Sequence, residues 1–227
     1  MPELPEANPD LGGLPDLHGE RVDYLGDHLL ETAAPADPFA LFSSWLSDAF
    51  TAKKRGVLPE PTAMVVSTTA GGRPSSRTVL LKEVSETGFV FFTNYGSRKA
   101  AEMAWSRYVA LLFGWYPMQR QVRVEGSSER VPRSESEAYF ASRPRGSQLG
   151  AWASAQSTEV TLEELVALYR QTEERFAGAD VPCPENWGGY RVWPESIEFW
   201  QGQASRMHDR LVYRRSGRGW EIVRLAP

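Results

Sequence analysis

Two arginines, a histidine and an aspartate lie within five consecutive positions of the stretch FWQGQASRMHDR, residues 199–210. Histidine titrates near neutral pH and arginine offers several donors in a planar fork, so Arg206 and His208 could orient or protonate a bound molecule. The plainer interpretation is a surface turn in which Asp209 neutralises Arg206 or Arg210. Taken alone, this stretch favours the turn.

A second basic cluster lies in NYGSRKAAEM, residues 94–103, where Gly96 and Ser97 lead into a predicted helix. Free backbone N–H groups and the helix dipole make such a start positive, and Arg98 and Lys99 add two full charges. An anion at this point would compensate them. A solvated basic pair on a surface helix is an equally good interpretation of this stretch by itself.

The stretch SSRTVLLK, residues 75–82, has Arg77 and Lys82 near the two ends of an apolar strand. Residues five apart point to opposite faces of a regular strand. Both can serve one ligand only if it lies along the strand end, or if the strand is bulged. Edge charges that discourage aggregation are the better interpretation of this stretch alone.

Hydroxyl and guanidinium groups gather in YFASRPRGSQLGAW, residues 139–152. Arginine forks beside hydroxyls suit a phosphate dianion, and glycines allow a close backbone approach. A loop that holds Leu149 and Trp152 beside two arginines is seldom purely solvated, so this stretch favours a binding role. The polar residues concerned are Tyr139, Arg143, Arg145, Ser147 and Gln148.

The charge balance of the whole chain changes how these basic clusters are interpreted. The 227 residues carry a formal net charge of -4, which argues against a general binder of nucleic acids or of membrane surfaces. In addition to the Arg206 stretch, this acidic protein has three further clusters of basic residues. These clusters suggest that more than one phosphate group is bound.

Several classes of protein are excluded by composition. The single cysteine, Cys183, rules out an internal disulfide, and the three histidines have no metal-ligand spacing, so no metal site is expected. There is no secretion signal and no apolar run of roughly 20 residues. These features favour a cytoplasmic globular protein.

Hydrophobic periodicity predicts a mainly β chain with several helices. Helices are expected after Asp37, which can cap a helix with Pro38 at its first position, over 97–105 and 134–142, and from Thr161 to about Phe176, where Thr161 and Glu164 form a capping box, with a loop over 143–157. The first of these helices would carry one apolar stripe, made of Phe42, Trp45, Leu46, Ala49 and Phe50. A hairpin over 63–82, with its turn at AGGRP, opens a series of seven or eight strands with mostly short connections, in which GGYRVWP and SIEFW are two separate strands; this favours an antiparallel barrel with helices outside. Residues 1–20 are predicted to form a mobile N-terminal arm.

Eight segments in order, from about residue 37 onward, resemble the pyridoxine (pyridoxamine) 5′-phosphate oxidase family. They are RTVLLK, FFTNYGSRKA, RQVRVEG, YFASRPRGSQLGAW, AQS, WGGYRV, IEFWQGQASRMHDR and RLAP. The resemblance implies an FMN-binding split β-barrel with surrounding helices, formed by one domain over 21–227 and active as a homodimer with FMN at the interface.

The implied reaction is the oxidation of pyridoxine 5′-phosphate and pyridoxamine 5′-phosphate by dioxygen to pyridoxal 5′-phosphate and hydrogen peroxide. Hydride would pass from C4′ of the substrate to N5 of the flavin, so the protein mainly stacks and aligns the two rings.

The resemblance also implies which residues bind the flavin, some of them contributed by the partner chain. They are Arg77, Thr78, Val79, Leu80, Leu81, Lys82, Phe92, Thr93, Arg98, Lys99, Gln121, Gln156, Ser157, Trp200 and Arg210.

A second implied set binds the substrate. The phosphate would lie among Lys82, Tyr139, Arg143 and Ser147. Arg206 and His208 would flank the pyridine ring as catalytic residues with Met207 between them, and Arg21 and Tyr24 of the segment RVDY would fold over the substrate.

Two rival functions fit much of this pattern. A related split-barrel flavin oxidase, such as those of phenazine biosynthesis, would act on a phosphate-free aromatic compound and would have no use for Tyr139, Arg143 and Ser147. A non-catalytic FMN- or pyridoxal-phosphate-binding protein would keep both phosphate sites but would not need Arg206 and His208.

Overall fold

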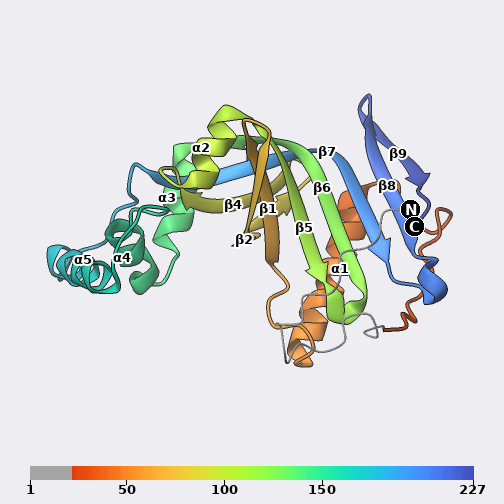
Figure 1. The fold of residues 1–227 in the computed structure, drawn as a ribbon, viewed down its shortest axis with the longest axis horizontal. Helices are drawn as coiled ribbons and strands as arrows, with labels where there is room; N and C mark the ends of the chain where they lie inside the picture. Colours follow the sequence, from red (N-terminus) through yellow and green to blue (C-terminus); the bar gives the residue numbers. More distant parts are fainter. Residues whose placement is uncertain (1–21) are drawn as a thin grey trace, which may run out of the picture.

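The structure, a computed structural model, describes residues 22–227 and is built around a nine-stranded sheet in which all neighbouring strands are antiparallel (Figure 1). The strand order is β2-β1-β5-β6-β7-β4-β3, with β8 paired to β7 and β9 to β8. The strands are β1 (Ala63–Ala70), β2 (Arg73–Leu80), β3 (Glu83–Ser85), β4 (Gly88–Asn94), β5 (Tyr108–Trp115), β6 (Arg120–Arg130), β7 (Trp187–Gln201), β8 (Asp209–Ser216) and β9 (Gly219–Arg224).

The sheet closes on itself at the junction between β2 and β3. Only Leu81 and Lys82 separate these strands, so one run of chain pairs with β1 and then with β4. The backbone N–H of Leu81 donates to the Thr62 carbonyl and that of Lys82 to the Val90 carbonyl, each at 2.8 Å. This corner confirms the predicted antiparallel barrel and places Lys82 where the strand changes partners.

The described residues form five α-helices outside the barrel: α1 (Pro38–Lys54), α2 (Arg98–Trp105), α3 (Arg133–Ala141), α4 (Arg145–Ala153) and α5 (Leu162–Arg175). The predicted caps are confirmed for two of them. The Asp37 side chain accepts from the Phe39 N–H at the start of α1, and Thr161 and Glu164 form the capping box of α5. These caps satisfy backbone donors that the first turn of a helix leaves unpaired.

Helix α1 packs an aromatic stripe against the barrel core. The Phe42 ring lies 5.0 Å from those of Phe89 and Phe113, and the Trp45 ring lies 5.3 Å from that of Phe199. Phe50, which also belongs to the predicted stripe, is 42% exposed. It follows Trp45 by five positions, which turns it away from the packed face.

The prediction of a loop over 143–157 was wrong, because most of this stretch forms α4. Leu149 and Ala153 are one helical turn apart and both are buried, Leu149 in a cluster with Phe140 and Trp187. Glycines at positions 146 and 150 lower the helical propensity of this stretch, so the helix is not predicted from the sequence. Packing of the apolar side supplies the stability that propensity lacks.

The prediction of two strands broken at Pro194 was also wrong, since β7 runs unbroken for 15 residues. The proline is accommodated at a β-bulge, where the register with β6 shifts between Glu125 and Gly126. A side chain at Gly126 would lie 2.0 Å from the Trp193 carbonyl oxygen. A bulge opposite a glycine is the setting in which a long strand tolerates proline.

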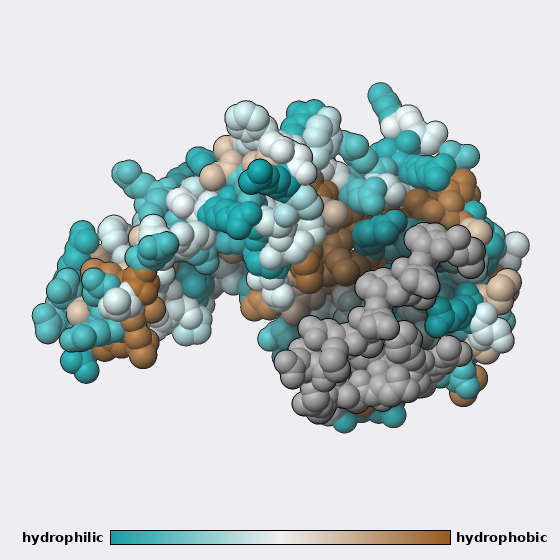
Figure 2. Space-filling model, in the orientation of Figure 1, coloured by the Kyte–Doolittle hydropathy of each residue, from teal (hydrophilic) through white to brown (hydrophobic). Residues whose placement is uncertain are grey.

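The helices α3, α4 and α5 lie at one end of the molecule and the β8–β9 hairpin at the other (Figure 1). Hydrophobic atoms gather at the α4–α5 end in Figure 2, and Leu162, Val166 and Leu168 are among the exposed side chains there. None of the helices formed by the described residues is both long and apolar enough to span a bilayer.

Candidate active site

A pocket of about 960 Å³ opens between β2, β4, the start of α2 and the helices α3 and α4. Among the described residues that line it, five are cationic and none is acidic. In a chain of net charge -4, such a lining favours anionic ligands. The lining residues are Arg77, Thr78, Val79, Leu80, Lys82, Phe92, Thr93, Asn94, Arg98, Lys99, Tyr139, Ser142, Arg143, Pro144, Ser147, Gly150, Ala151, Ser154, Gln156, Ser157 and Trp187.

Fourteen of the predicted site residues therefore line one pocket, although the chain segments that carry them are spread from 77 to 157. Leu81 is the member of the 77–82 run that does not line it. Its side chain is 4% exposed and belongs to the hydrophobic core. Tyr139 comes from the end of α3, Arg143 from the short link between α3 and α4, and Ser147 from α4, the helix that the sequence prediction missed.

Lys99 is buried at the floor of the pocket without a carboxylate partner. Its ammonium donates to Thr93 Oγ1 at 3.0 Å, to Gln156 Oε1 at 2.8 Å and to Ser97 Oγ at 3.3 Å. Burial, together with the positive charge of Arg77, lowers the pKa of Lys99 to about 8. An anion beside this group would favour its charged form.

A buried carboxylate, Glu102, holds the two neighbouring arginines. Its Oε2 accepts from Arg77 Nη2 at 3.0 Å and its Oε1 from Arg98 Nε at 2.8 Å. Burial raises the pKa of Glu102, but the hydrogen bonds from Ser75, Thr68, Arg98 and Arg77 outweigh it and bring the pKa to about 2. The sequence prediction missed Glu102, although its position four residues after Arg98 could have indicated an ion pair on one helix face.

Aromatic rings form one wall of the pocket. The Phe92 ring stacks on those of Tyr139 and Trp187, with centroids 4.1 and 5.4 Å away. The Arg143 guanidinium lies 4.7 Å from the centre of the Trp187 ring, and its Nη1 is buried with no hydrogen-bond partner among residues 22–227. Burial lowers the pKa of Arg143. A buried donor without a partner costs free energy, so a ligand acceptor at this point would stabilise the pocket.

Two polar residues of the same stretch support the backbone instead. Arg145 donates to the carbonyls of Phe176 and Ala179, and Gln148 to those of Phe140 and Ala141. They fasten α4 to its surroundings and do not line the pocket.

The remaining predicted flavin residues form a row on another part of the sheet. Gln121 of β6 lies opposite Trp200 of β7, which lies opposite Arg210 of β8. Residues directly opposite one another on neighbouring strands share a face. Spacing along the chain could not predict this row, because it depends on the register of three strands.

The loop after β7 brings the predicted catalytic residues next to this row. The His208 ring lies 4.7 Å from that of Trp200 and 5.6 Å from that of Tyr24. His208 Nδ1 accepts from the backbone N–H of Gln203 at 3.1 Å. Ser205 and Arg206 have left-handed backbone conformations, with φ of 55° and 60°, and residues other than glycine adopt these only under constraint. Arg206 and Met207 are exposed, and Arg21 lies outside the described residues.

The expectation that Asp209 neutralises Arg206 or Arg210 was wrong. Asp209 accepts from Arg224 Nη1 at 2.6 Å and from His28, the Leu29 N–H and Gln203. These bonds tie the segment after Tyr24 to the loop and to β9. The side chains of adjacent residues in a strand point to opposite faces, which separates Asp209 from Arg210.

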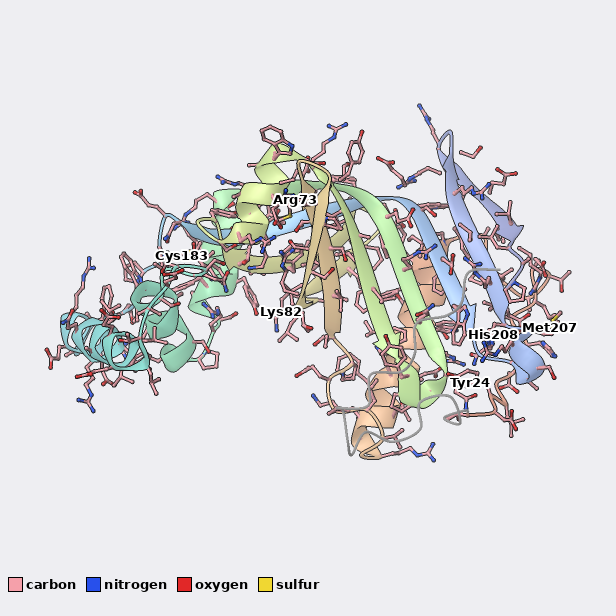
Figure 3. All side chains as sticks on the ribbon, viewed as in Figure 1. Tyr24, Arg73, Lys82, Cys183, Met207 and His208 are labelled. Atoms are coloured by element: carbon pink, nitrogen blue, oxygen red, sulfur yellow. The ribbon has the colours of Figure 1, made fainter. Side chains whose placement is uncertain are left out.

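One chain thus carries the predicted site in two separate parts. Figure 3 shows Lys82 beside β2 near the middle of the molecule, and Tyr24, Met207 and His208 together at the end that carries β8 and β9. We call the first part the cationic pocket, and the second part, made of Gln121, Trp200, Arg210, Arg206 and His208, the β8 group. Among the described residues no cluster of three histidines, cysteines or carboxylates is arranged to hold a metal ion.

Comparisons with known proteins show which family the chain resembles. The model of a family described as pyridoxamine 5′-phosphate oxidase matches residues 50–175, and that of a pyridoxine 5′-phosphate oxidase C-terminal dimerisation region matches residues 187–227. A pyridoxine/pyridoxamine 5′-phosphate oxidase of Rubrobacter xylanophilus is 54% identical over 95% of this chain and 99% of its own length. One from Streptomyces avermitilis is 52% identical, over 91% and 94%.

Solved structures share the fold. The structure of PhzG from Burkholderia lata, in complex with tetrahydrophenazine-1-carboxylic acid, has a TM-score of 0.81 and 30% identity over 89% of this chain and 99% of its own. An FMN-binding protein related to pyridoxamine 5′-phosphate oxidase from Nostoc punctiforme has a TM-score of 0.66 and 15% identity, over 81% and 96%. With both family models and the curated relatives in agreement, the chain belongs to the pyridoxine/pyridoxamine 5′-phosphate oxidase family.

Proposed function

We propose that this protein is an FMN-dependent oxidase that converts pyridoxine 5′-phosphate and pyridoxamine 5′-phosphate, with dioxygen, into pyridoxal 5′-phosphate and hydrogen peroxide. The observation that carries the proposal is the composition of the cationic pocket, which has five cationic residues and no acidic one. They lie in two groups. Arg77, Arg98 and Lys99 surround the start of α2, whereas Lys82 and Arg143 lie beside Tyr139.

The pocket fits FMN at its α2 end. Lys99 is a buried ammonium whose partners are all neutral oxygens, and Arg77 and Arg98 are oriented by Glu102. Together these groups suit a phosphate dianion at a helix start. Val79 and Leu80, at the end of the exposed strand β2, line the adjoining part of the pocket. A flat ring system can lie along the backbone there. FMN supplies the acceptor for the substrate's hydride when bound.

The second phosphate belongs to the substrate in this proposal. Arg143 has a buried Nη1 without a partner, and Tyr139, Ser147 and Lys82 line the same part of the pocket. A phosphate placed there would accept from all four side chains. These hydrogen bonds to the phosphate are made far from the reacting carbon. They would therefore fix the position of the pyridine ring and contribute mainly to substrate binding.

We further propose that the complete site lies between two copies of the chain. The cationic pocket and the β8 group lie apart in one molecule (Figure 3), so we infer that the partner subunit completes each of them. A two-fold dimer would place the β8 group of the partner subunit against the pocket and create two equivalent sites. The name of the family model that matches residues 187–227 supports dimerisation through this region.

The β8 group would then face the ring of the substrate. The Gln203 N–H donates to His208 Nδ1, so a neutral His208 carries its proton on Nε2 and acts there as a hydrogen-bond donor. Arg206 is a donor as well. Both residues would hold the polar edge of the substrate and keep its C4′ aligned with the flavin, while Tyr24 and Trp200 support the imidazole ring.

An oxidase that acts on a phosphate-free aromatic compound is the second candidate. The likeness to PhzG at 30% identity and a TM-score of 0.81 favours it. Such a substrate would leave the Arg143 Nη1 without an acceptor, and Lys82 and Tyr139 without a function in binding. The pocket therefore supports the phosphorylated substrates better.

The test follows flavin absorbance in the FMN-loaded protein under argon. Addition of pyridoxine 5′-phosphate should bleach the flavin, and admission of air should restore it and leave pyridoxal 5′-phosphate. Unphosphorylated pyridoxine is the matched control and should bleach the flavin far more slowly at equal concentration. A flavin that stays oxidised with both B6 phosphates would overturn the proposal. Bleaching by a dihydrophenazine compound alone would favour the second candidate. If neither the B6 phosphates nor the dihydrophenazine compound bleaches the flavin, the result would favour a non-catalytic binding protein.

A further inference from the structure

The guanidinium of Arg210 is held in one orientation by two acceptors of its own chain. Its Nε donates to Glu198 Oε1 at 3.3 Å and its Nη2 to Glu198 Oε2 at 2.9 Å, a two-pronged contact on one carboxylate. Its Nη1 donates to the Ala226 carbonyl at 2.8 Å. Arginine has five N–H donors in a fixed plane, so these three bonds leave two donors available for a ligand.

Glu198 is a buried carboxylate of the sheet at 4% exposed, as is Asp209 of β8 at 6%. It lies on β7, between Arg123 of β6 and Val212 of β8 in the strand register. Its Oε2 also accepts from Arg123 Nη2 at 2.9 Å. A buried carboxylate is costly unless it is paired and hydrogen-bonded, and this one is placed two positions from Trp200, on the same face as the β8 group.

We propose that Glu198 is a positioning residue that orients Arg210 for its contact with the flavin. The inference rests on the proposed function, in which Arg210 reaches the flavin bound in the cationic pocket of the partner subunit. A flexible arginine would lose side-chain entropy on each binding event. The two-pronged contact with Glu198 removes that cost in advance and fixes the plane of the donors that face the ligand.

A simpler role for Glu198 would be to neutralise Arg123 across the sheet. The Arg123 side chain is 44% exposed and forms another ion pair, with Glu125 at 3.3 Å. It therefore does not depend on Glu198 alone. If Glu198 serves Arg123, removal of either partner will have the same effect. If it serves Arg210, removal of Arg123 will leave flavin binding unchanged.

The experiment compares four variants of the full chain, Glu198→Gln, Arg123→Met, Arg210→Met and the double variant E198Q/R210M. FMN is removed from each, and its dissociation constant on reconstitution is measured by quenching of flavin fluorescence, alongside the thermal midpoint of the FMN-free protein. Glutamine matches glutamate in size but offers one neutral oxygen and one NH₂ group, so it cannot accept from Nε and Nη2 of Arg210 on two separate charged oxygens.

We expect E198Q to weaken FMN binding by roughly tenfold, the loss typical of one charge-assisted hydrogen bond. R123M should bind FMN within about twofold of the unaltered protein. In the double variant, E198Q should add nothing to the loss caused by R210M, because a positioning residue has no effect once the residue it positions is gone.

Each other result has a definite meaning. If R210M binds FMN normally, the flavin contact of Arg210, and with it this part of the proposed function, is wrong. If R210M loses affinity but E198Q does not, or if R123M matches E198Q, or if the two losses add in the double variant, Glu198 does not position Arg210. If E198Q does not fold, Glu198→Asp takes its place, since it keeps the charge but shortens the side chain, and it should bind FMN more weakly than the unaltered protein and than R123M.

Discussion

Five cationic side chains share one pocket, yet they differ in what holds them. Arg77 and Arg98 are paired with the buried Glu102, whereas the buried Lys99 donates only to neutral oxygens of Thr93, Ser97 and Gln156. Paired arginines keep their orientation without a ligand, but an ammonium among neutral partners gains most when an anion binds. Lys99 is thus the residue through which pH should act on flavin binding.

Affinity for FMN should fall as the pH rises above about 8. The pKa of Lys99 is lowered from its ordinary value to about 8 by burial and by Arg77, so the ammonium is present below this pH and is lost above it. A bound phosphate dianion favours the charged form, so binding above pH 8 must take up a proton and weakens by up to about tenfold per pH unit.

The measurement is the FMN dissociation constant between pH 6.5 and 9.5 for the unaltered protein and for Lys99→Met, with riboflavin as the control ligand. Riboflavin has no phosphate and should show no such slope. K99M should bind FMN more weakly at pH 7 and lose the slope above pH 8. An equal slope in both proteins would assign the effect to another group.

At the scale of the elements, the sequence predicted the helices and strands whose ends carry capping residues or turn glycines. Asp37 with Pro38, the capping box at Thr161, and the Gly71–Gly72 turn between β1 and β2 were all identified, and the structure confirms the elements that they bound. Helix α4 and the unbroken β7 were missed for one reason. Tertiary packing there overrides glycine and proline, which act as breakers in a local sequence pattern.

The bulge between β6 and β7 supplies a prediction at this scale. Gly126→Ala should destabilise the FMN-free protein by roughly 1–3 kcal/mol, because the added carbon would lie 2.0 Å from the Trp193 carbonyl oxygen, a backbone atom that cannot turn aside. Gly150→Ala on α4 is the matched control. Nothing lies within 4 Å of its added carbon, so it should stabilise by about 0.5–1 kcal/mol. Urea unfolding of both variants measures this contrast, and equal stabilities would show that β7 does not need the glycine.

At the scale of the whole molecule, the sequence predicts a set of site residues but not where they lie. Fourteen of them meet in the cationic pocket. Gln121, Trp200 and Arg210 instead form a row set by strand register, and Figure 3 places Lys82 far from His208 and Met207. One sequence cannot show that residues are separated in the monomer and joined between subunits, because that depends on the symmetry of an assembly.

The most direct test of a site shared between two chains is complementation in a mixed dimer. One chain carries Arg143→Met, which damages the pocket, and the other Arg210→Met, which damages the β8 group. Tagged chains are co-expressed, the mixed dimer is purified, and its oxidation of pyridoxine 5′-phosphate is measured beside the two parent variants. A site shared between subunits leaves one site wholly intact in the mixed dimer, so we predict about half of the unaltered activity. Activity no higher than that of the weaker parents would contradict the shared site and place both halves within one chain.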